Sequence, residues 1–447
     1  MTEEADTLTL LDDLLAKAKA AGAEAADAVS FESAALSHSQ RLGAVEKLER
    51  EESRDLGLRV LIGHRQAIVS STDVLPSALD ELVERAVAMA RNVPDDPYCG
   101  LADPERILRE IPEIDLCDPE EPAPEALIER ARACEDAARA VAGVTNSEGA
   151  EASWSRTRVA LAASNGFRGG YEVSRHGVGV AVLAGEGLAM ERDYDFSTSV
   201  YGRNLEDPAA VGTRAGERAV KRLGARKAKT GRFPVVYDPR VANGILGHLA
   251  GAISGPAVAR GTSFLKDRLG EAVFAAGITV VDDPHRPLGL RSKPFDGEGL
   301  ANRRRQVIDG GRLTTWILSL NSARQLGLES TGHATRGTSG PPAPAPTNLY
   351  MEPGTRTPAE LMADVDQGFY VTELMGMGVN PVTGDYSRGA AGFWIEQGAL
   401  AYPVSELTIA GNLKNMFRNL TPADDLAFRY GTNAPTLRIE GMTVAGS

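Results

Sequence analysis

The feature that most constrains the fold is a helix–strands–helix pattern that the first half of the chain carries twice. Leucines at helical spacing and apolar runs of strand-like composition mark the elements of the first copy. These elements are a helix over 7–22, strands near 26–36, 44–51, 57–62 and 66–71, and a helix over 76–91. The second copy comprises a helix over 125–141, strands through 150–200 with a hairpin at Asn165-Gly166, and a helix over 208–223. The pattern predicts two α+β units, although no residue-level repeat accompanies it.

The second half of the chain is dominated by strands and turns. After a break at 227–231, the sequence predicts a strand over 233–237 and a helix over 239–253. Strand-like runs flank Gly310-Gly311, and the proline-rich segment 340–346 predicts an extended loop. We therefore expect an α+β fold, with helix–strands–helix α/β sandwich units followed by a β-rich, barrel- or sandwich-like C-terminal domain.

The length of the chain predicts more than one domain, because 447 residues exceed a single ordinary core. Residues 94–122 are rich in proline and acidic side chains, which is typical of an exposed connector. We expect an N-terminal α+β domain over 1–93, a connector over 94–122, a central α+β region over 123–228 and a β-rich C-terminal domain over 229–447.

Acidic charge is concentrated in the first third of the chain. Residues 1–150 carry 32 acidic and 15 basic side chains, a net charge of −17, whereas the whole chain carries 61 and 48, a net charge of −13. The remainder is therefore slightly basic, at +4. Because phosphate binding needs a basic surface, we expect no nucleic-acid partner for this first third.

The cysteines and the N-terminus predict a cytoplasmic protein. Cys99, Cys117 and Cys134 lack the spacing of a metal site, and an odd number argues against a disulfide framework. The first residues, Met1 to Asp6, are acidic and lack the apolar core of an export signal. No apolar run approaches the roughly 18 residues of a membrane span, so we expect no membrane partner.

Four motifs in the C-terminal half carry a resemblance to a known family. The longest is Gly376–Glu396, in which glycines and a proline at fixed places precede an apolar, strand-like stretch. The others are Phe233–Asp238 with Pro239, Ser330–Arg336 and Thr436–Gly441. Together they resemble the TldD/PmbA family of two-subunit zinc proteases, and within it the PmbA, or TldE, branch. The resemblance extends over nearly the whole chain.

The resemblance also points to a metal motif that this chain lacks. In the TldD branch a helix carries His-Glu-x-x-x-His, and a later cysteine completes the zinc ligands while the glutamate serves as general base. The matching positions here are Gly247, His248 and Ala252, and no cysteine follows Cys134. The resemblance therefore implies no catalytic residue and no metal bound by this chain, with zinc held by a partner subunit.

Several other residues are candidates for contact with a peptide or a partner. The candidates are His248, Asp296, Glu298, Asp385, Tyr386, Ser387 and Arg388. A packing role is the alternative for His248. Asp296 and Glu298 lie in an Asp-Gly-Glu-Gly stretch that favours a turn, although paired carboxylates could also bind a metal or act as acid and base. A buried pair between Arg388 and Asp385 is expected to pin a turn next to glycines.

By resemblance, we expect a non-catalytic TldE/PmbA-type subunit that is inactive alone. It would form a heterodimer with a TldD-like catalytic subunit and process or degrade unfolded peptides. An extended peptide would add as a strand to an exposed sheet edge. One alternative is a homodimeric module that binds peptides or proteins without a protease partner. A second is a peptidase whose site the sequence does not reveal.

Overall fold

The first half of the chain folds into one long curved sheet. The computed structural model describes residues 3–446. Six antiparallel strands follow the order β3-β2-β1-β4-β5-β6. Their bounds are β1 Ala25–Arg41, β2 Ala44–Ile62, β3 Arg65–Ser71, β4 Val144–Ala163, β5 Arg168–Ala184 and β6 Glu191–Ser199. The two predicted units meet at β1 and β4, which pair from Asp27↔Ala163 to Gln40↔Ala150 and so merge both units into one sheet.

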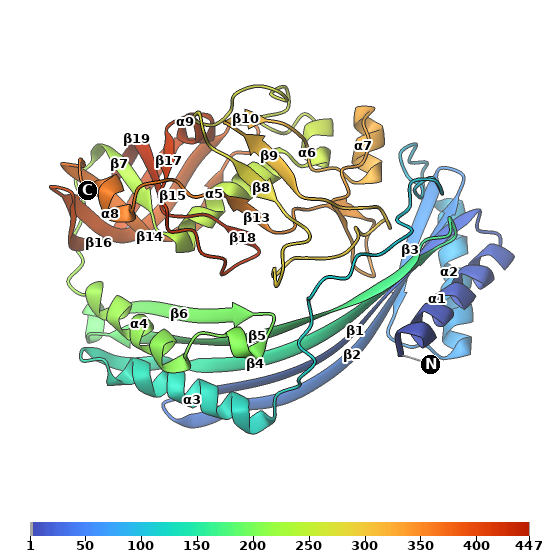
Figure 1. The fold of residues 1–447 in the computed structure, drawn as a ribbon, viewed down its shortest axis with the longest axis horizontal. Coiled ribbons are helices and arrows are strands. Elements are labelled where there is room, and N and C mark those ends of the chain that lie inside the picture. Colours follow the sequence, from blue (N-terminus) through green and yellow to red (C-terminus); the bar gives the residue numbers. More distant parts are fainter. Residues whose placement is uncertain (1–2, 447) are drawn as a thin grey trace.

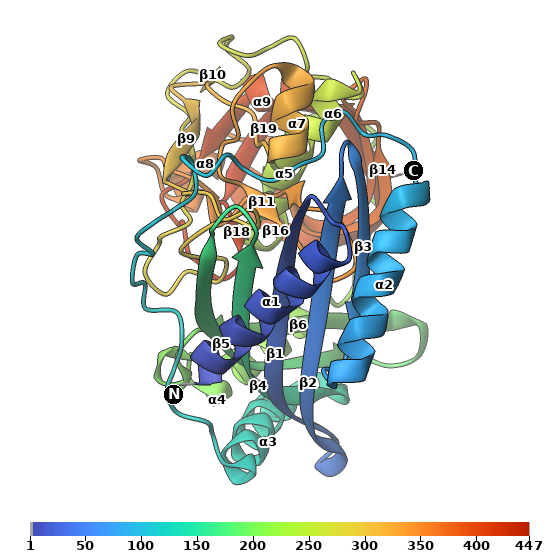
Figure 2. The same ribbon diagram turned by 90° about the vertical axis from the view of Figure 1, so that its right-hand side faces the viewer.

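Each half of the sheet carries its own pair of helices on the outer face (Figures 1 and 2). The helices are α1 Glu3–Ala20, α2 Pro76–Asn92, α3 Pro124–Ala140 and α4 Pro208–Lys221. The predicted double helix–strands–helix pattern is therefore confirmed. One detail is wrong, because the runs near 44–51 and 57–62 form a single strand, β2.

The alternation of side chains along β1 explains how one sheet serves three cores. Ala28 faces the core under α1 and α2, and Leu36 faces the core under α3 and α4. Val29 and its neighbour Phe31 point to the opposite, inner face, where they meet the C-terminal domain. Successive residues of a strand point to opposite faces, so β1 can pack on both sides.

The C-terminal domain is built around a five-stranded barrel. The bounds of its strands are β7 Gly231–Tyr237, β14 Gln367–Val379, β15 Asp385–Glu396, β16 Ala399–Asn412 and β19 Leu437–Ala445, with β17 Leu420–Pro422 added on β19. The sheet closes because β16 pairs with β15 and β19, while β7 pairs with β14 and β19. The prediction of a β-rich, barrel-like domain is confirmed.

A second, more irregular sheet packs beside the barrel, in the order β10-β9-β8-β13-β18. Its strands are β8 Val280–Asp282, β9 Arg305–Asp309, β10 Arg312–Leu313, β13 Leu349–Met351 and β18 Thr432–Asn433. The helices of this domain are α5 Pro239–Ala252, α6 Gly255–Ala259, α7 Leu320–Leu326, α8 Pro358–Met362 and α9 Leu413–Arg418. The predicted loop 340–346 contains one short strand, β12 Ala343–Pro344, which pairs with β11 Ala334–Thr335.

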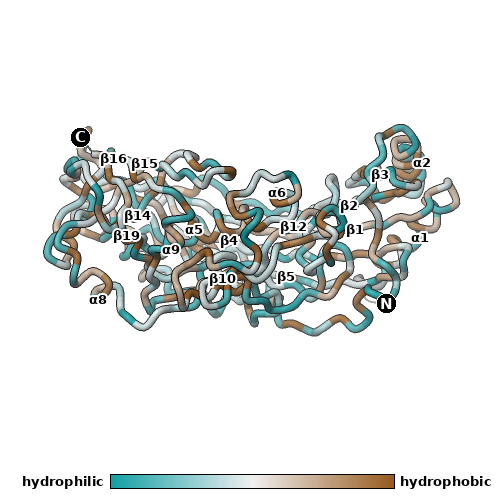
Figure 3. Tube along the Cα trace, turned by 90° about the horizontal axis from the view of Figure 1, so that it is seen from above, coloured by the Kyte–Doolittle hydropathy of each residue, from teal (hydrophilic) through white to brown (hydrophobic). Residues whose placement is uncertain are grey.

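The C-terminal domain lies against the inner face of the curved sheet (Figure 1). Seen from above, α1 and α2 lie at one end of the molecule and the barrel at the other (Figure 3). Residues 94–122 follow the seam between the two parts, where Ala102, Ile107 and Leu116 are buried. The expectation of an exposed segment therefore fails at these three residues, whereas Asp103–Arg106 are exposed. None of the helices formed by residues 3–446 combines the length and apolar character that a membrane span requires.

Candidate functional site

Helix α5 lies where the resemblance places the metal motif. Asp238 caps its N-terminus, since its Oδ1 accepts from the backbone N–H of Arg240 at 2.9 Å. Pro239 occupies the first turn, where its missing N–H costs no hydrogen bond. Ile245 and Leu249 are buried in the core of the C-terminal domain and fix the rotation of the helix. The sequence thus determines which face of α5 is left outside the core.

The three motif positions on α5 face different environments. Gly247 is exposed, His248 is half-buried, and Ala252 is buried, with 3% of its surface exposed. Positions five residues apart on a helix are turned by about 140°. Gly247 and Ala252 offer no donor atom, so the residues present do not fit a zinc ion. Across the described residues 3–446, no group of three or more His, Cys, Asp or Glu side chains could hold a metal ion.

His248 is part of a small cluster with two side chains of β15. Its ring packs edge-on against Tyr386, with 5.7 Å between ring centroids. Burial lowers the pKa of His248, and the nearby charge of Arg388 lowers it further. The imidazole is therefore neutral at pH 7, with one ring nitrogen able to donate and the other able to accept.

The predicted pair between Arg388 and Asp385 is wrong. Asp385 is exposed and accepts from the hydroxyl of Thr383 at 2.7 Å and from the amide of Asn412 at 3.0 Å. Arg388 instead donates to the carbonyl oxygen of Met375 at 3.2 Å. The segment is a strand and not a turn, and residues three apart on a strand point to opposite faces.

The same alternation divides the four predicted contact residues of β15. Tyr386 is buried and Arg388 is half-buried, and both lie on the face that carries His248. Asp385 and Ser387 are exposed on the other face. The structure therefore brings His248, Tyr386 and Arg388 together, and separates them from Asp385 and Ser387.

A cavity of about 360 Å³ opens beside this cluster, between β6, α5, β14 and β15. Arg240 of α5 pairs with Asp193 of β6 at 2.7 Å, and Arg222 pairs with Glu373 of β14 at 2.6 Å. Burial alone would lower the pKa of Arg240, but Asp193 more than offsets it and the net shift is upward. Arg388 lines the cavity without a described carboxylate partner and is the cation that could bind a peptide carbonyl or carboxylate there.

Asp296 and Glu298 lie elsewhere, at the seam with the curved sheet, and both are buried. Asp296 accepts three backbone N–H groups, from Glu298 and Leu300 at 2.9 Å and from Ala334 at 3.2 Å. Glu298 accepts the backbone N–H of Leu320 at 2.8 Å. Burial, reinforced by the charge of Asp296, raises the pKa of Glu298 to about 8. These carboxylates hold loops together at a place that a peptide cannot reach.

Replacing Glu298 by Gln should change how stability depends on pH. The folded protein holds the Glu298 proton up to about pH 8, whereas the unfolded chain loses it near 4.5. The folded state therefore binds more protons in this window, and the unfolding free energy of the wild type should fall as pH rises from about 4.5 to 8. Glu298→Gln keeps an oxygen for Leu320 and should flatten this slope, as measured by urea denaturation at several pH values.

The control for this prediction is Glu329→Gln, which removes a carboxylate whose side chain is 83% exposed. It should leave the slope of the wild type in place. A Glu298→Gln variant with an unchanged slope would show that Glu298 is ionised in the folded protein at neutral pH.

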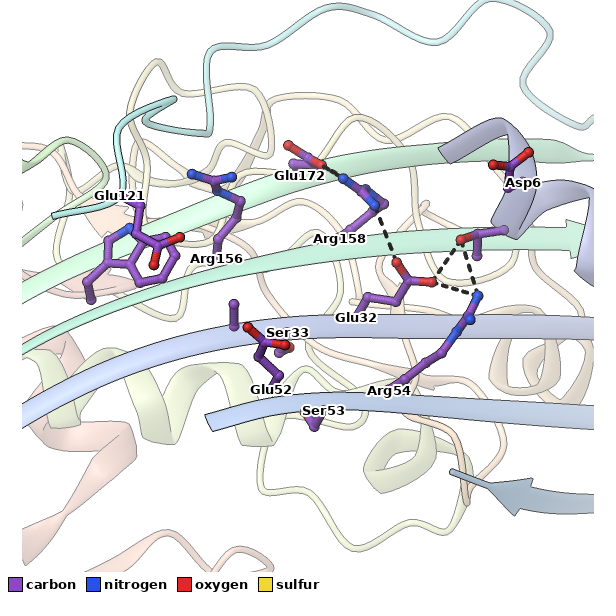
Figure 4. A pocket seen from close by; sticks show the side chains of 13 residues that line it. Asp6, Glu32, Ser33, Glu52, Ser53, Arg54, Glu121, Arg156, Arg158 and Glu172 are labelled. Atoms are coloured by element: carbon purple, nitrogen blue, oxygen red, sulfur yellow. Dashed lines mark hydrogen bonds and ion pairs between the residues drawn. The ribbon is translucent and has the colours of Figure 1, made fainter. Parts of the chain in front are cut away.

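A larger hollow, of about 630 Å³, lies on the outer face of the sheet between the two helix pairs (Figure 4). Four of its charged side chains are paired with one another. Glu32 accepts from Thr7 at 2.8 Å and pairs with Arg54 at 2.8 Å and Arg158 at 3.3 Å, and Arg158 also pairs with Glu172 at 2.6 Å. In the α5 cavity, by contrast, Arg388 has a backbone carbonyl and no described carboxylate as its partner, so we place the candidate site there.

Sequence reasoning missed the charged wall of the α5 cavity. Asp193 and Arg240 lie 47 residues apart, and Arg222 and Glu373 lie 151 apart, so no local spacing links them. The one available signal was Asp193 and Asp195, two acidic residues on the same face of a strand that also carries Tyr194 and Phe196. Asp195 binds arginines of α4 and of the C-terminal domain, so this signal marks the domain seam.

Comparisons with known proteins agree over the whole chain. Three family models match, described as PmbA/TldA metallopeptidase domain 1 over residues 26–90, the central domain over 117–223 and the C-terminal domain over 230–446. The Metalloprotease PmbA of Escherichia coli O157:H7 is 40% identical over 97% of this chain and 94% of its own length. A Metalloprotease PmbA homolog of Haemophilus influenzae is 36% identical over 96% and 93%.

Solved structures share the fold. A protein of Bacteroides thetaiotaomicron superposes with a TM-score of 0.90 at 27% identity, covering 98% of each chain. TldE from Thermococcus kodakarensis superposes with a TM-score of 0.88 at 22% identity, covering 98% of this chain and all of its own. The family models together span most of the chain, and the identity to PmbA exceeds 30% over nearly its full length. The chain therefore belongs to the PmbA/TldD metallopeptidase family.

Proposed function

We propose that this chain is the non-catalytic, TldE/PmbA-type subunit of a cytoplasmic, heterodimeric zinc metalloprotease that processes or degrades unfolded peptides. The observation that carries the proposal is the set of residues on α5. Gly247 and Ala252 have no ligand atom, and His248 stands where the resemblance implies the general base. A TldD-like partner would hold the zinc and supply the glutamate. This chain would contribute walls of the peptide-binding site and a sheet edge to which the peptide binds.

The outer edge of β2 is suited to holding an extended peptide. β3 pairs only with Leu56–Ile62, so residues 44–55 of β2 have β1 on one side and no described strand on the other. Residues 44–53 are all exposed. An extended chain could add here through main-chain hydrogen bonds, which give affinity with little dependence on sequence. The α5 cavity, which Arg388 lines, and the adjacent His248 are the second candidate contact with peptide or partner.

The test is a paired assay of zinc content and peptide cleavage. The chain alone should contain no stoichiometric zinc and should not cleave an unfolded peptide such as reduced, alkylated lactalbumin. Mixing with a TldD-like chain that carries His-Glu-x-x-x-His should produce zinc-dependent cleavage. Mutation of the partner's motif glutamate should abolish it. Stoichiometric zinc and cleavage by the chain alone would overturn the proposal.

The open edge of β2 also favours one alternative, a homodimeric module that binds peptides or proteins without a protease partner. Sedimentation of the mixture separates the two. A one-to-one complex with the TldD-like chain supports the protease subunit. A homodimer that does not bind the TldD-like chain supports the binding module. Cleavage that persists after mutation of the partner's glutamate would instead indicate a site of this chain's own.

A further inference from the structure

A small cavity of about 90 Å³ lies at the seam between the curved sheet and the C-terminal domain. One wall is apolar and consists of side chains from β1, β4 and β5 with one from the C-terminal domain: Val29, Phe31, Val159, Leu161, Tyr171 and Phe295. The opposite wall carries Lys293, Asp296 and Arg336. A cavity with an apolar side and a few convergent polar groups is typical of a small-ligand site.

Arg336 is the unusual member of this wall. Its side chain is 2% exposed, and its Nη1 donates to Asp27 on β1. Its other two nitrogens, Nε and Nη2, are buried without a hydrogen-bond partner. These two N–H groups form one edge of the planar guanidinium, the edge that binds the two oxygens of a carboxylate side by side. A buried donor without an acceptor lowers the stability of the folded protein, so an acceptor bound to this edge would be stabilising.

The neighbouring Arg59 shows the same edge in use. Its Nε and Nη2 both donate to Oδ2 of Asp27, the first at 3.0 Å. Asp27 is thereby shared between two arginines, with Oδ2 bound to Arg59 and Oδ1 to Nη1 of Arg336, and it does not bind the Nε and Nη2 edge of Arg336. Both guanidiniums are almost fully buried, with 4% and 2% of their side chains exposed. Compared with Arg59, whose Nε and Nη2 edge binds a carboxylate, Arg336 lacks a carboxylate at the same edge.

No other described group on the polar wall fills that place. The oxygens of Asp296 are taken by three backbone N–H groups, and Lys293 donates to the carbonyl oxygen of Ala334 at 2.7 Å. The guanidiniums of Arg59 and Arg336 carry two buried positive charges and share one carboxylate, that of Asp27. One bound monoanion would neutralise the cluster, as buried charges require.

We propose that this cavity is a binding site for a small monocarboxylate, of the size of acetate to butyrate, whose carboxylate binds the free edge of Arg336 and whose short alkyl chain lies against the apolar wall. The volume admits an anion of this size but not a peptide. The proposal does not depend on the protease assignment, because it concerns a site within this chain alone.

The test compares acetate and butyrate with chloride, at equal ionic strength, and with acetamide, a neutral molecule of the same shape as acetate. We expect the melting temperature of the full chain to rise with acetate or butyrate and not with acetamide. Saturation-transfer NMR of acetate should show direct binding. The dipeptide Ala-Ala, which also ends in a carboxylate, should not bind, which distinguishes a free acid from a peptide terminus.

Two variants remove the site in different ways. Arg336→Gln removes the carboxylate edge, and Val159→Phe fills the cavity while leaving the bond between Arg336 and Asp27 intact. Each should weaken acetate binding by about tenfold or more, since hydrogen bonds to charged groups are strong. Arg303→Gln removes the same charge from an exposed position and should leave binding unchanged.

Two results would overturn the proposal. The first is an acetate effect no larger than that of chloride, which would mean that water alone occupies the cavity. The second is acetate binding that survives in both Arg336→Gln and Val159→Phe, which would place the anion elsewhere on the chain.

Discussion

Replacing Asp27 by Asn should lower the unfolding free energy by about 3–5 kcal/mol at pH 7, the usual cost of breaking a buried ion pair by removing one partner. Asp27 is 2% exposed and is the only carboxylate described in contact with both Arg59 and Arg336. Asparagine fits the space but leaves both guanidiniums uncompensated. A loss of this size is a large share of the roughly 5–15 kcal/mol by which proteins are stable.

The pH dependence of this contribution has a definite sign. Burial alone would raise the pKa of Asp27, but Arg336 and Arg59 lower it below the ordinary value of 3.8. The stabilisation is therefore complete above about pH 3.8 and is lost as the pH falls below it. Urea midpoints of the wild type and of Asp27→Asn should converge only at strongly acidic pH.

The matched control is Asp12→Asn. Asp12 pairs with Arg168 at 3.0 Å, but the two side chains are 50% and 46% exposed. Its loss should cost at most about 1 kcal/mol, as for other surface pairs. Asp27 also joins β1 to Arg336 of the C-terminal domain, 309 positions away. Asp27→Asn should therefore increase protease cleavage between residues 223 and 231, in the segment that joins α4 to β7, whereas Asp12→Asn should not. Equal urea midpoints for the two variants would contradict the prediction.

The second large effect is expected for Gly212→Ala on α4. A methyl group there would lie 2.0 Å from the carbonyl oxygen of Cys134 and 3.0 Å from the backbone nitrogen of Ala138, both on α3. Ordinary van der Waals contact begins near 3.4 Å, so α3 and α4 would have to move apart. We expect a loss of about 1–3 kcal/mol or more, because overpacking strains a close-packed core. Thermal and urea unfolding measure it.

Gly251→Ala on α5 is the matched control for this second prediction. Gly251 is exposed, and a methyl group added there meets no atom within 4 Å. The same substitution should therefore raise stability by up to about 1 kcal/mol, because alanine favours a helix over glycine. A loss of stability in Gly251→Ala would contradict the helix-propensity argument. No loss in Gly212→Ala would contradict the expected clash between α3 and α4.

The sequence was most informative where the determinants of structure are local. The helix expected over 76–91 is α2, Pro76–Asn92, and that expected over 239–253 is α5, Pro239–Ala252. Each has an apolar stripe that is buried and a proline in its first turn, both of which can be read within about 15 residues. The hairpin at Asn165-Gly166 joins β4 to β5 for the same local reason.

Long-range pairing could not be derived in this way. The barrel closes through β7 and β19, which lie about 200 residues apart, and the merging of two units depends on the register of β1 against β4. The predicted Arg388–Asp385 pair does not form because both residues lie on strand β15, where residues three apart point to opposite faces, and the turn precedes them at Pro381–Thr383. The predicted roles of His248, Tyr386 and Arg388 in contacting a peptide or partner stay predictions.

The continuous pairing of β1 with β4 has a consequence for dissecting this protein. The sequence models that recognise domain 1 and the central domain divide the chain between 90 and 117, yet β1 and β4 share a ladder that runs from Asp27 to Gln40. A fragment ending near residue 93 would expose that whole ladder as an unpaired edge, which invites aggregation. The division between these two family models is therefore not a division between units that fold independently. Any truncated protein should keep both units together.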